Sequence, residues 1–127
     1  MMDFPNPITM FLEYMVPSHA LTNEELDRKN YRRLTAKYPG YIPVIVKSPN
    51  IQFLRTRYIV SPSTLMSQFL IELRQNAPLL RPEEAIFLFI NDEIMTPLNE
   101  SIRNIYYRYR QINGFLYITA TKENTFG

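Results

Sequence analysis

Apolar residues recur along this chain with two periods, one typical of helices and the other typical of strands. Near the N-terminus, Ile8, Phe11, Leu12 and Met15 have the i, i+3, i+4, i+7 spacing of a short amphipathic helix, which Pro17 ends. A membrane or a partner is one possible target for its apolar stripe, but we expect this helix to dock onto its own domain.

A second helix is predicted from Asn23 to about Lys37. Thr22 and Glu25 have the spacing of a capping box, in which the two side chains satisfy backbone N–H groups at the start of a helix. Apolar residues are sparse in this segment, so we expect a surface helix with one narrow stripe facing inward.

Two strands follow the helices. Residues 41–47, YIPVIVK, are dense in β-branched side chains, and Pro43 is compatible with a strand only near its start, at an edge or at a bulge. Residues 53–60, FLRTRYIV, form the second predicted strand. Its period of two places Arg55 and Arg57 on the same side.

The second half of the chain alternates helices and strands. Ser61 to Thr64 offers helix caps, and helical spacing then continues to about Asn76. Residues 85–90, AIFLFI, form a continuous apolar run, as expected of a strand buried on both faces. The remaining predictions are a turn at Asn91 and Asp92, a short paired segment at Ile94 and Met95, a helix marked by Ile102, Ile105, Tyr106 and Tyr109, and a strand from Phe115 to Thr121.

This order predicts an α+β fold. From the first strand onward it is the order of a β-grasp, with the last strand in the middle of a mixed sheet, and the two leading helices are additions. With 127 residues, 46% of them hydrophobic, the chain fits one domain with a real core. We expect an N-terminal helical extension at 1–37, a β-grasp core at 38–121 and a flexible tail at 122–127.

Composition excludes several kinds of chemistry. The chain has no cysteine, and therefore no disulfide, thiol nucleophile or thiolate metal site. Its one histidine, His19, stands in a predicted loop, and three glycines are too few for a phosphate-binding loop. Pairs of adjacent acidic residues occur at 24–25, 83–84 and 92–93. Each pair lies at a predicted helix start or turn, where helix-dipole and capping roles account for the first two. We therefore expect no catalytic residue, metal or cofactor, and a binding or modifier protein rather than an enzyme.

Charge and hydropathy bear on partners and location. The net charge of +2 gives no reason to expect nucleic acid, although five of the 14 basic residues lie in 28–37. Such a run is usually a solvated helix face, and a partner or lipid-headgroup surface is the alternative. No apolar run approaches the roughly 20 residues that span a bilayer, and the N-terminus does not read as a signal peptide. We expect a cytoplasmic monomer whose membrane attachment is acquired.

The last stretch, GFLYITATKENTFG, resembles the C-terminus of the autophagy-related ubiquitin-like modifiers. That family includes GABA-receptor-associated protein, the light-chain-three proteins and yeast autophagy-related protein eight. The resemblance extends to KYPGYIPVIVK at 37–47, RYIV at 57–60, QFLIELR at 68–74 and EEAIFLFIND at 83–92. It implies a ubiquitin-like β-grasp with two extra N-terminal helices, whereas the first eighteen residues are unlike the usual family start.

The resemblance implies conjugation through Gly127. Activating and conjugating enzymes of the autophagy pathway would pass its carboxylate to the amine of phosphatidylethanolamine, placing the protein on autophagosomal membrane. A cysteine protease trims most members to this glycine and removes the lipid again. Here the sequence ends at Gly127, either because the gene encodes the mature form or because the chain was cut.

The resemblance also implies capture of aromatic-x-x-aliphatic peptides, such as those of cargo receptors, as an added strand on the exposed edge of the second strand. Arg57 flanks the first pocket, Arg55 holds the neighbouring basic position, and Arg74 matches an arginine that bonds the peptide backbone or its acidic neighbours. The first pocket, for the aromatic side chain, corresponds to Leu34, Pro43, Ile59 and Phe115, and the second, for the aliphatic one, to Tyr58, Val60, Phe69 and either Met66 or Leu65.

Three departures from the family pattern bear on specificity. Glu72 stands at a usually aliphatic position of the second pocket, Asn30 replaces a common acidic residue, and Tyr41 replaces a common arginine. Without the resemblance, Phe69 and Phe115 could be ordinary core residues, and the three arginines could be a solvated pair and a cation at a helix C-terminus. Alternative functions are a non-conjugated adaptor for peptides or cytoskeletal and receptor tails, and a tag that modifies proteins.

Overall fold

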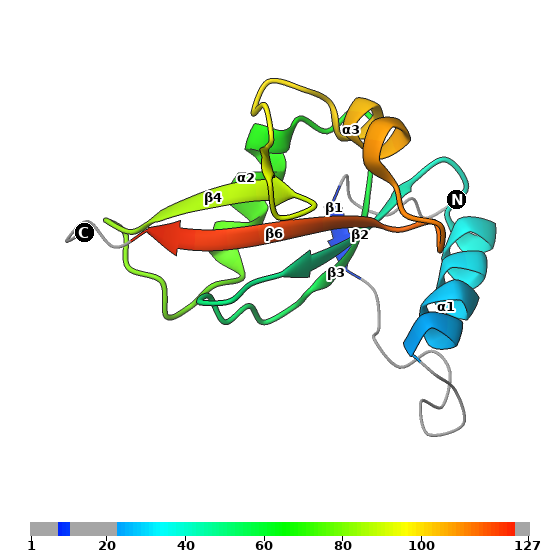
Figure 1. Ribbon diagram of the computed structural model, residues 1–127, viewed down its shortest axis with the longest axis horizontal. Helices are drawn as coiled ribbons and strands as arrows, with labels where there is room; N and C mark the ends of the chain where they lie inside the picture. Colours follow the sequence, from blue (N-terminus) through cyan, green and yellow to red (C-terminus); the bar gives the residue numbers. More distant parts are fainter. Residues whose placement is uncertain (1–7, 11–22, 124–127) are drawn as a thin grey trace, which may run out of the picture.

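The computed structural model describes residues 8–10 and 23–123. The described elements are β1 (Ile8–Met10), α1 (Asn23–Lys37), β2 (Ile42–Lys47), β3 (Arg57–Val60), α2 (Met66–Gln75), β4 (Ala85–Ile90), β5 (Ile94–Met95), α3 (Ile102–Tyr109) and β6 (Leu116–Glu123). The strands form one mixed sheet in the order β1-β3-β2-β6-β4-β5 (Figure 1).

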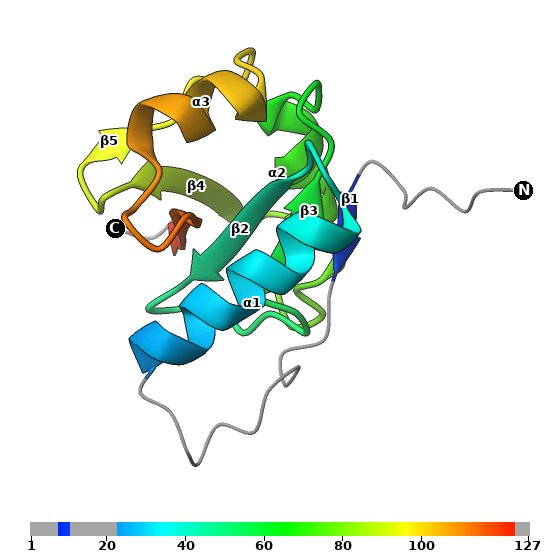
Figure 2. The same cartoon turned by 90° about the vertical axis from the view of Figure 1, so that its right-hand side faces the viewer.

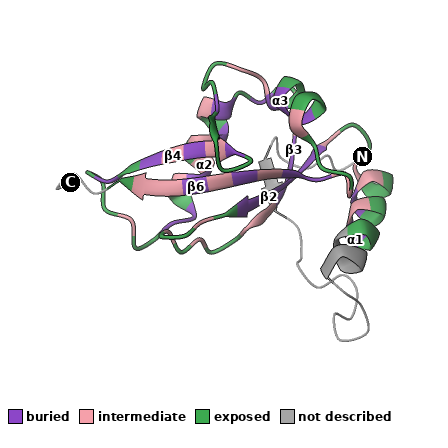
Figure 3. Ribbon diagram, in the orientation of Figure 1, coloured by how far each residue is buried: buried purple, intermediate pink, exposed green. Residues whose placement is uncertain are grey.

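The last strand occupies the middle of the sheet, as the sequence predicts. β6 runs parallel to β2, from Val44 opposite Leu116 to Lys47 opposite Thr119. It runs antiparallel to β4 on its other edge. Burial alternates along β6, with Leu116, Ile118 and Ala120 buried in the larger core and Tyr117 and Thr119 half-buried, and Figure 3 shows buried and intermediate stretches along this strand. The β-grasp prediction is confirmed.

Helices cover the two faces of the sheet unequally. The larger core joins α2 and α3 to one face, through side chains such as Phe69, Leu73 and Ile105 packed against β2, β4 and β6. A smaller cluster joins Leu34 of α1 to Ile45 and Ile59 on the opposite face. Figure 2 shows α1 lying across β2. Among residues 8–10 and 23–123, α1 is the helix on this face, and it does not reach the half of the sheet that holds β4.

That uneven cover corrects the prediction for residues 85–90. β4 alternates along its length, with Ile86, Leu88 and Ile90 buried and Phe87 and Phe89 only half-buried. The continuous apolar run therefore does not mark a strand buried on both faces. The two phenylalanines lie on the face that α1 does not reach.

The first predicted helix is wrong where the structure describes it. Ile8–Met10 is a strand, β1, which pairs antiparallel with β3. The helical spacing of apolar residues there is outweighed by the backbone hydrogen-bonding groups that the edge of β3 offers. The rest of that prediction, from Phe11 to Pro17, lies outside the described residues, as do Thr22 and His19.

The second predicted strand is shorter than expected. β3 begins at Arg57, and the residues before it leave the ladder. The N–H of Leu54 donates to the carbonyl of Asn76 at 2.8 Å, just after α2 ends. The end of α2 therefore holds this segment at Leu54, while the N–H of Val46 in β2 still donates to the carbonyl of Thr56 at 2.7 Å.

The start of α2 is capped differently from the prediction. The capping position is Leu65, not a residue of the preceding Ser61 to Thr64. The side-chain oxygen of Gln68 accepts from the Leu65 N–H at 2.9 Å. The N–H groups of Met66 and Ser67 donate to carbonyls of the loop before α3. Loop carbonyls thus replace the expected hydroxyl cap.

Candidate functional site

The centre of the predicted peptide site is β3, which the structure pairs on both edges. On one edge β2 lies antiparallel, with Pro43 opposite Ile59 and Val44 opposite Tyr58. On the other edge lies β1, with Thr9 opposite Ile59 and Met10 opposite Tyr58. The edge that a peptide was expected to join is therefore occupied by the chain's own β1.

The four side chains predicted for the first pocket come together. Leu34, Ile59 and Phe115 belong to one cluster under α1, and Pro43 lies opposite Ile59 in the neighbouring strand. Pro43 is buried and precedes the parallel pairing with β6, which begins at Val44. Leu34 and Ile59 are 1% exposed and Phe115 is 0% exposed. They pack against one another, and an entering aromatic side chain would have to part them.

The side chains predicted for the second pocket lie on the opposite face. Tyr58, Val60, Met66 and Phe69 are all 0% exposed and belong to the larger core. The rings of Tyr58 and Phe69 meet edge to face, with centroids 5.3 Å apart. Of the two alternatives for the last position, Met66 packs with this group, whereas Leu65 is 37% exposed. The period of two along β3 is confirmed, since Tyr58 and Val60 face away from Ile59.

The charges of Glu72 and Arg55 have opposite effects on the pKa of the Tyr58 hydroxyl. Burial raises the pKa of the Tyr58 hydroxyl well above its ordinary value, the charge of Glu72 raises it further, and Arg55 opposes the rise. The hydroxyl donates to the Arg55 carbonyl at 2.9 Å. The carboxylate of Glu72 is therefore close enough to the Tyr58 side of the site to act on it electrostatically.

The three predicted arginines lie in different settings. Arg57 begins β3 and is half-buried, whereas Arg55 is exposed and lies outside any strand. The prediction that a single strand places both on one side is therefore wrong for Arg55. Arg74, in the last turn of α2, donates through its guanidinium to the carbonyl of Glu84 and so ties α2 to the start of β4.

Two aromatic residues that were not predicted to belong to the site, Tyr31 and Tyr106, hold Phe115 in place. The ring of Tyr31 in α1 meets Phe115 edge to face, with centroids 5.9 Å apart. The hydroxyl of Tyr106 in α3 donates to the carbonyl of Gly114 at 2.7 Å. Gly114 has φ +94°, and a Cβ there would run into the Tyr31 ring. In the sequence, the one sign of this close packing is a glycine, Gly114, directly before the predicted site residue Phe115.

Asn30 is fully buried in α1. Neither its amide nitrogen nor its amide oxygen has a hydrogen-bond partner within the described part of the chain. In the sequence, this position is notable only as a departure from the family pattern.

The base of the C-terminal tail is fastened by polar side chains from two loops. The side-chain amide of Asn50 bonds both the N–H and the carbonyl of Lys122, each at 3.0 Å. The ammonium of Lys122 lies 3.3 Å from the carboxylate of Glu84. Asn50 and Lys122 also line a cavity of about 190 Å³ with Ile51, Gln52, Leu79 and Leu80. Gly127 itself lies outside the described residues.

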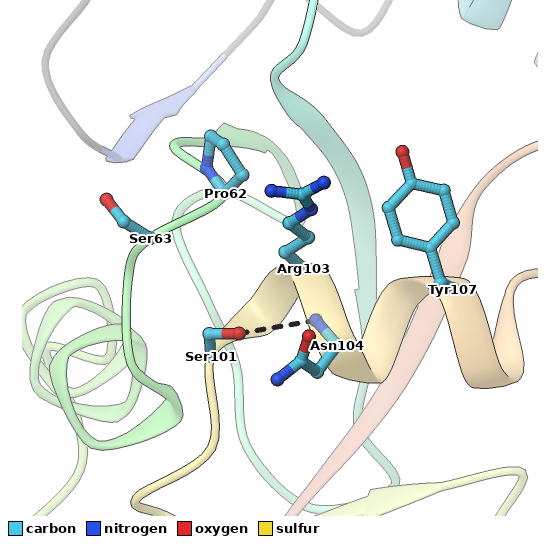
Figure 4. Close-up of a pocket in the computed structure, with 6 residues that line it drawn as sticks. All are labelled: Pro62, Ser63, Ser101, Arg103, Asn104 and Tyr107. Atoms are coloured by element: carbon cyan, nitrogen blue, oxygen red, sulfur yellow. Dashed lines mark hydrogen bonds between the residues drawn. The ribbon is translucent and has the colours of Figure 1, made fainter.

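A larger hollow of about 520 Å³ lies away from these residues, at the start of α3 (Figure 4). It is lined by Pro62, Ser63, Ser101, Arg103, Asn104 and Tyr107. The hydroxyl of Ser101 caps α3 by accepting from the N–H of Asn104 at 3.3 Å. None of these residues was predicted to have a function.

With this geometry in view, comparison with known proteins decides the family. A family model described as "Autophagy protein Atg8 ubiquitin like" matches residues 26–127. The chain belongs to the Atg8 family of ubiquitin-like autophagy proteins. Among its relatives, "Autophagy-related protein 8" of Dictyostelium discoideum is 38% identical over 106 residues, which cover 79% of this chain and 84% of the relative.

Other Atg8 proteins agree in sequence and in fold. "Autophagy-related protein 8" of Schizosaccharomyces pombe is 40% identical over 100 residues, covering 76% of this chain and 81% of the relative. The crystal structure of Trypanosoma brucei ATG8 superimposes with a TM-score of 0.71 at 23% identity and covers 88% of this chain and 98% of that one. At that identity the likeness supports the ubiquitin-like fold alone.

No helix among the described residues has the length and apolar character needed to cross a bilayer. No three side chains of the metal-binding types His, Cys, Asp and Glu gather within the described ranges.

Proposed function

We propose that this Atg8-family chain is a modifier joined through its C-terminal glycine to phosphatidylethanolamine, and that it recruits peptide-bearing partners to autophagosomal membrane. The observation that carries the proposal is the family membership together with a glycine four residues beyond the last described residue of β6. Four residues reach about 13 Å when extended, enough to carry a carboxylate into a narrow enzyme site.

The conjugation would proceed in three balanced steps. The Gly127 carboxylate attacks ATP to give an acyl-adenylate and pyrophosphate. A cysteine of the activating enzyme, and then one of the conjugating enzyme, takes the acyl group as a thioester, and AMP leaves at the first transfer. The amine of phosphatidylethanolamine then forms an amide, and the thiol is released. The chain supplies only the carboxylate and its positioning, so it needs no cofactor and no catalytic residue of its own.

Peptide capture is the second half of the proposal. The side chains of β3 lead into two separate apolar clusters, one on each face of the sheet. An extended peptide on this edge would place alternate side chains toward the two faces, as an aromatic-x-x-aliphatic segment requires. Arg55 and Arg57 would meet acidic residues ahead of the motif. Partners of this class, the two conjugation enzymes and a delipidating cysteine protease complete the proposed set.

Location follows from conjugation in this proposal. The free chain is a cytoplasmic monomer, and the conjugated chain is on autophagosomal membrane.

Reconstitution tests the conjugation half. Purified protein is incubated with the activating and conjugating enzymes, ATP and liposomes containing phosphatidylethanolamine. We expect a lipid adduct in the intact mass of the wild type and none after deletion of Gly127. An adduct that persists without Gly127 contradicts the mechanism. No adduct on the wild type, with peptide binding retained, favours the non-conjugated adaptor.

A further inference from the structure

The edge of β3 that a partner peptide is expected to join, called the peptide edge below, is occupied by β1 of the same chain. β1 pairs with β3 over three residues, Ile8 opposite Val60, Thr9 opposite Ile59 and Met10 opposite Tyr58. These partners on β3 are the residues that a captured peptide would pair with. Figure 1 shows β1 beside β3, at the edge of the sheet.

A strand has only two edges for backbone hydrogen bonds. β2 takes one edge of β3 over its whole length, from Ile42 opposite Val60 to Ile45 opposite Arg57. β1 takes the other. A peptide and β1 therefore cannot pair with the same residues of β3 at the same time.

From this exclusion we infer that β1 is an internal competitor for the peptide edge, so that a partner peptide binds β3 only when β1 leaves. The inference rests on the proposed peptide capture and adds its regulation. It also assigns a role to the N-terminal residues, which are the part of the chain that the family match leaves out.

The competition is set by the length of β1 and by its tether. Three residues of pairing make few hydrogen bonds, and an isolated strand pair of this size is marginal in water. The twelve residues between Met10 and Asn23 keep β1 attached to the domain, which gives it a high local concentration at the edge. Such a strand is always present but readily displaced. The apparent affinity for a peptide falls in proportion to the fraction of molecules with an open edge.

A removable crosslink tests the competition within one protein. Ile8 and Val60 are directly opposite, and such pairs in antiparallel strands have Cα atoms about 4.5–5.5 Å apart, a spacing that a disulfide can bridge. The wild type has no cysteine, so the variant Ile8→Cys with Val60→Cys can form one internal disulfide only. Cysteine is close in size to the buried valine, and the reduced form of the same variant is the matched control.

The probe is a fluorescein-labelled peptide with two aspartates ahead of tryptophan-x-x-leucine, titrated by fluorescence anisotropy. We expect the oxidised variant to bind at least about tenfold more weakly than the reduced one, and a protein lacking residues 1–10 to bind about tenfold more tightly than the wild type. Equal affinities within both comparisons overturn the competition while leaving peptide capture in place. Failure of the two cysteines to crosslink under oxidant also overturns it. No binding by any form, the shortened protein included, overturns peptide capture itself.

Discussion

The side chain of Asn50 occupies the position of a missing strand beside Lys122. β2 pairs with β6 only as far as Lys47 opposite Thr119. Beyond that point, the Asn50 amide donates to the Lys122 carbonyl and accepts from the Lys122 N–H, both at 3.0 Å. A loop residue therefore continues the ladder to the root of the tail.

Substitution of Asn50 should release the end of β6. In Asn50→Ala we expect hydrogen exchange at the Lys122 amide to accelerate by about tenfold, because its acceptor is lost. Asn50→Asp is the matched control, since it keeps an acceptor for the Lys122 N–H and replaces the amide donor with a carboxylate oxygen. Nuclear magnetic resonance exchange rates decide the matter, and unchanged protection in the alanine variant would show that Asn50 does not hold the strand.

Glu84 should make stability depend on pH at the same end of the sheet. The N–H of Arg81, donating at 2.9 Å, and the charges of Lys122 and Arg81 hold the pKa of the Glu84 carboxyl below its ordinary value, against burial, which raises it. Because the folded pKa is below the unfolded one, about 4.3, the stabilisation is present above that pH and is lost as the pH falls through the folded pKa.

Urea unfolding of the wild type and Glu84→Gln measures this contribution. We expect the variant to be less stable at neutral pH and the difference in stability to shrink as the pH falls below about 4.3. Glu83→Gln is the neighbouring control, since its side chain is 62% exposed. A difference that stays constant with pH would rule out the charged carboxylate as the cause.

Gly114 should tolerate no side chain. Gly114→Ala combines φ +94° with a Cβ that meets the Tyr31 ring, so we expect a loss of about 2 kcal/mol or more in the free energy of unfolding. Gly40→Ala separates the two causes, because Gly40 has φ +86° but no heavy atom within 4 Å of the added Cβ. It should cost about 1 kcal/mol.

A double-mutant cycle completes the test of Gly114. In a Tyr31→Ala background the ring is absent, and Gly114→Ala should cost about as much as Gly40→Ala does. An undiminished cost there would exclude the contact with Tyr31 as the reason for glycine.

Glu72 should set the preference of the second pocket. Its carboxylate acts on Tyr58, so removal of the charge should favour an aliphatic peptide side chain. We expect Glu72→Leu to bind an aromatic-x-x-leucine peptide about fivefold more tightly, and a peptide with lysine at that position more weakly, than the wild type does. Glu72→Gln is the control, because it removes the charge of the side chain while keeping its size and shape. Identical preferences in all three proteins would place Glu72 outside the pocket.

The central fold could be predicted from local sequence patterns. The strand Phe115 to Thr121 combines β-branched and aromatic residues in a period of two, and the structure extends it to Glu123. The α3 helix follows an equally clear spacing of apolar residues, and the helix from Asn23 to Lys37 was predicted from its capping box and a narrow apolar stripe. In each case the local preference and the packing agree.

The sequence failed where long-range pairing outweighs local preference. Ile8 to Met10 has helical spacing but forms a strand, because an open edge of β3 is available to it. Asn50 and Lys122 are 72 residues apart, and no local pattern links them. The family resemblance named side chains that the structure brings together on each face, Leu34, Ile59 and Phe115 on one and Tyr58, Val60 and Phe69 on the other, whereas no pattern predicted the strand β1 at their edge.

The most direct measurement of the proposed adaptor is recruitment of a peptide to vesicles. The conjugation reaction is run on phosphatidylethanolamine liposomes with the labelled aromatic-x-x-leucine peptide present, and the vesicles are then floated through a density gradient. We expect the peptide to float with the wild type, and neither with the protein lacking Gly127 nor with Arg57→Glu. Flotation of the peptide with either variant at the wild-type level would contradict the account.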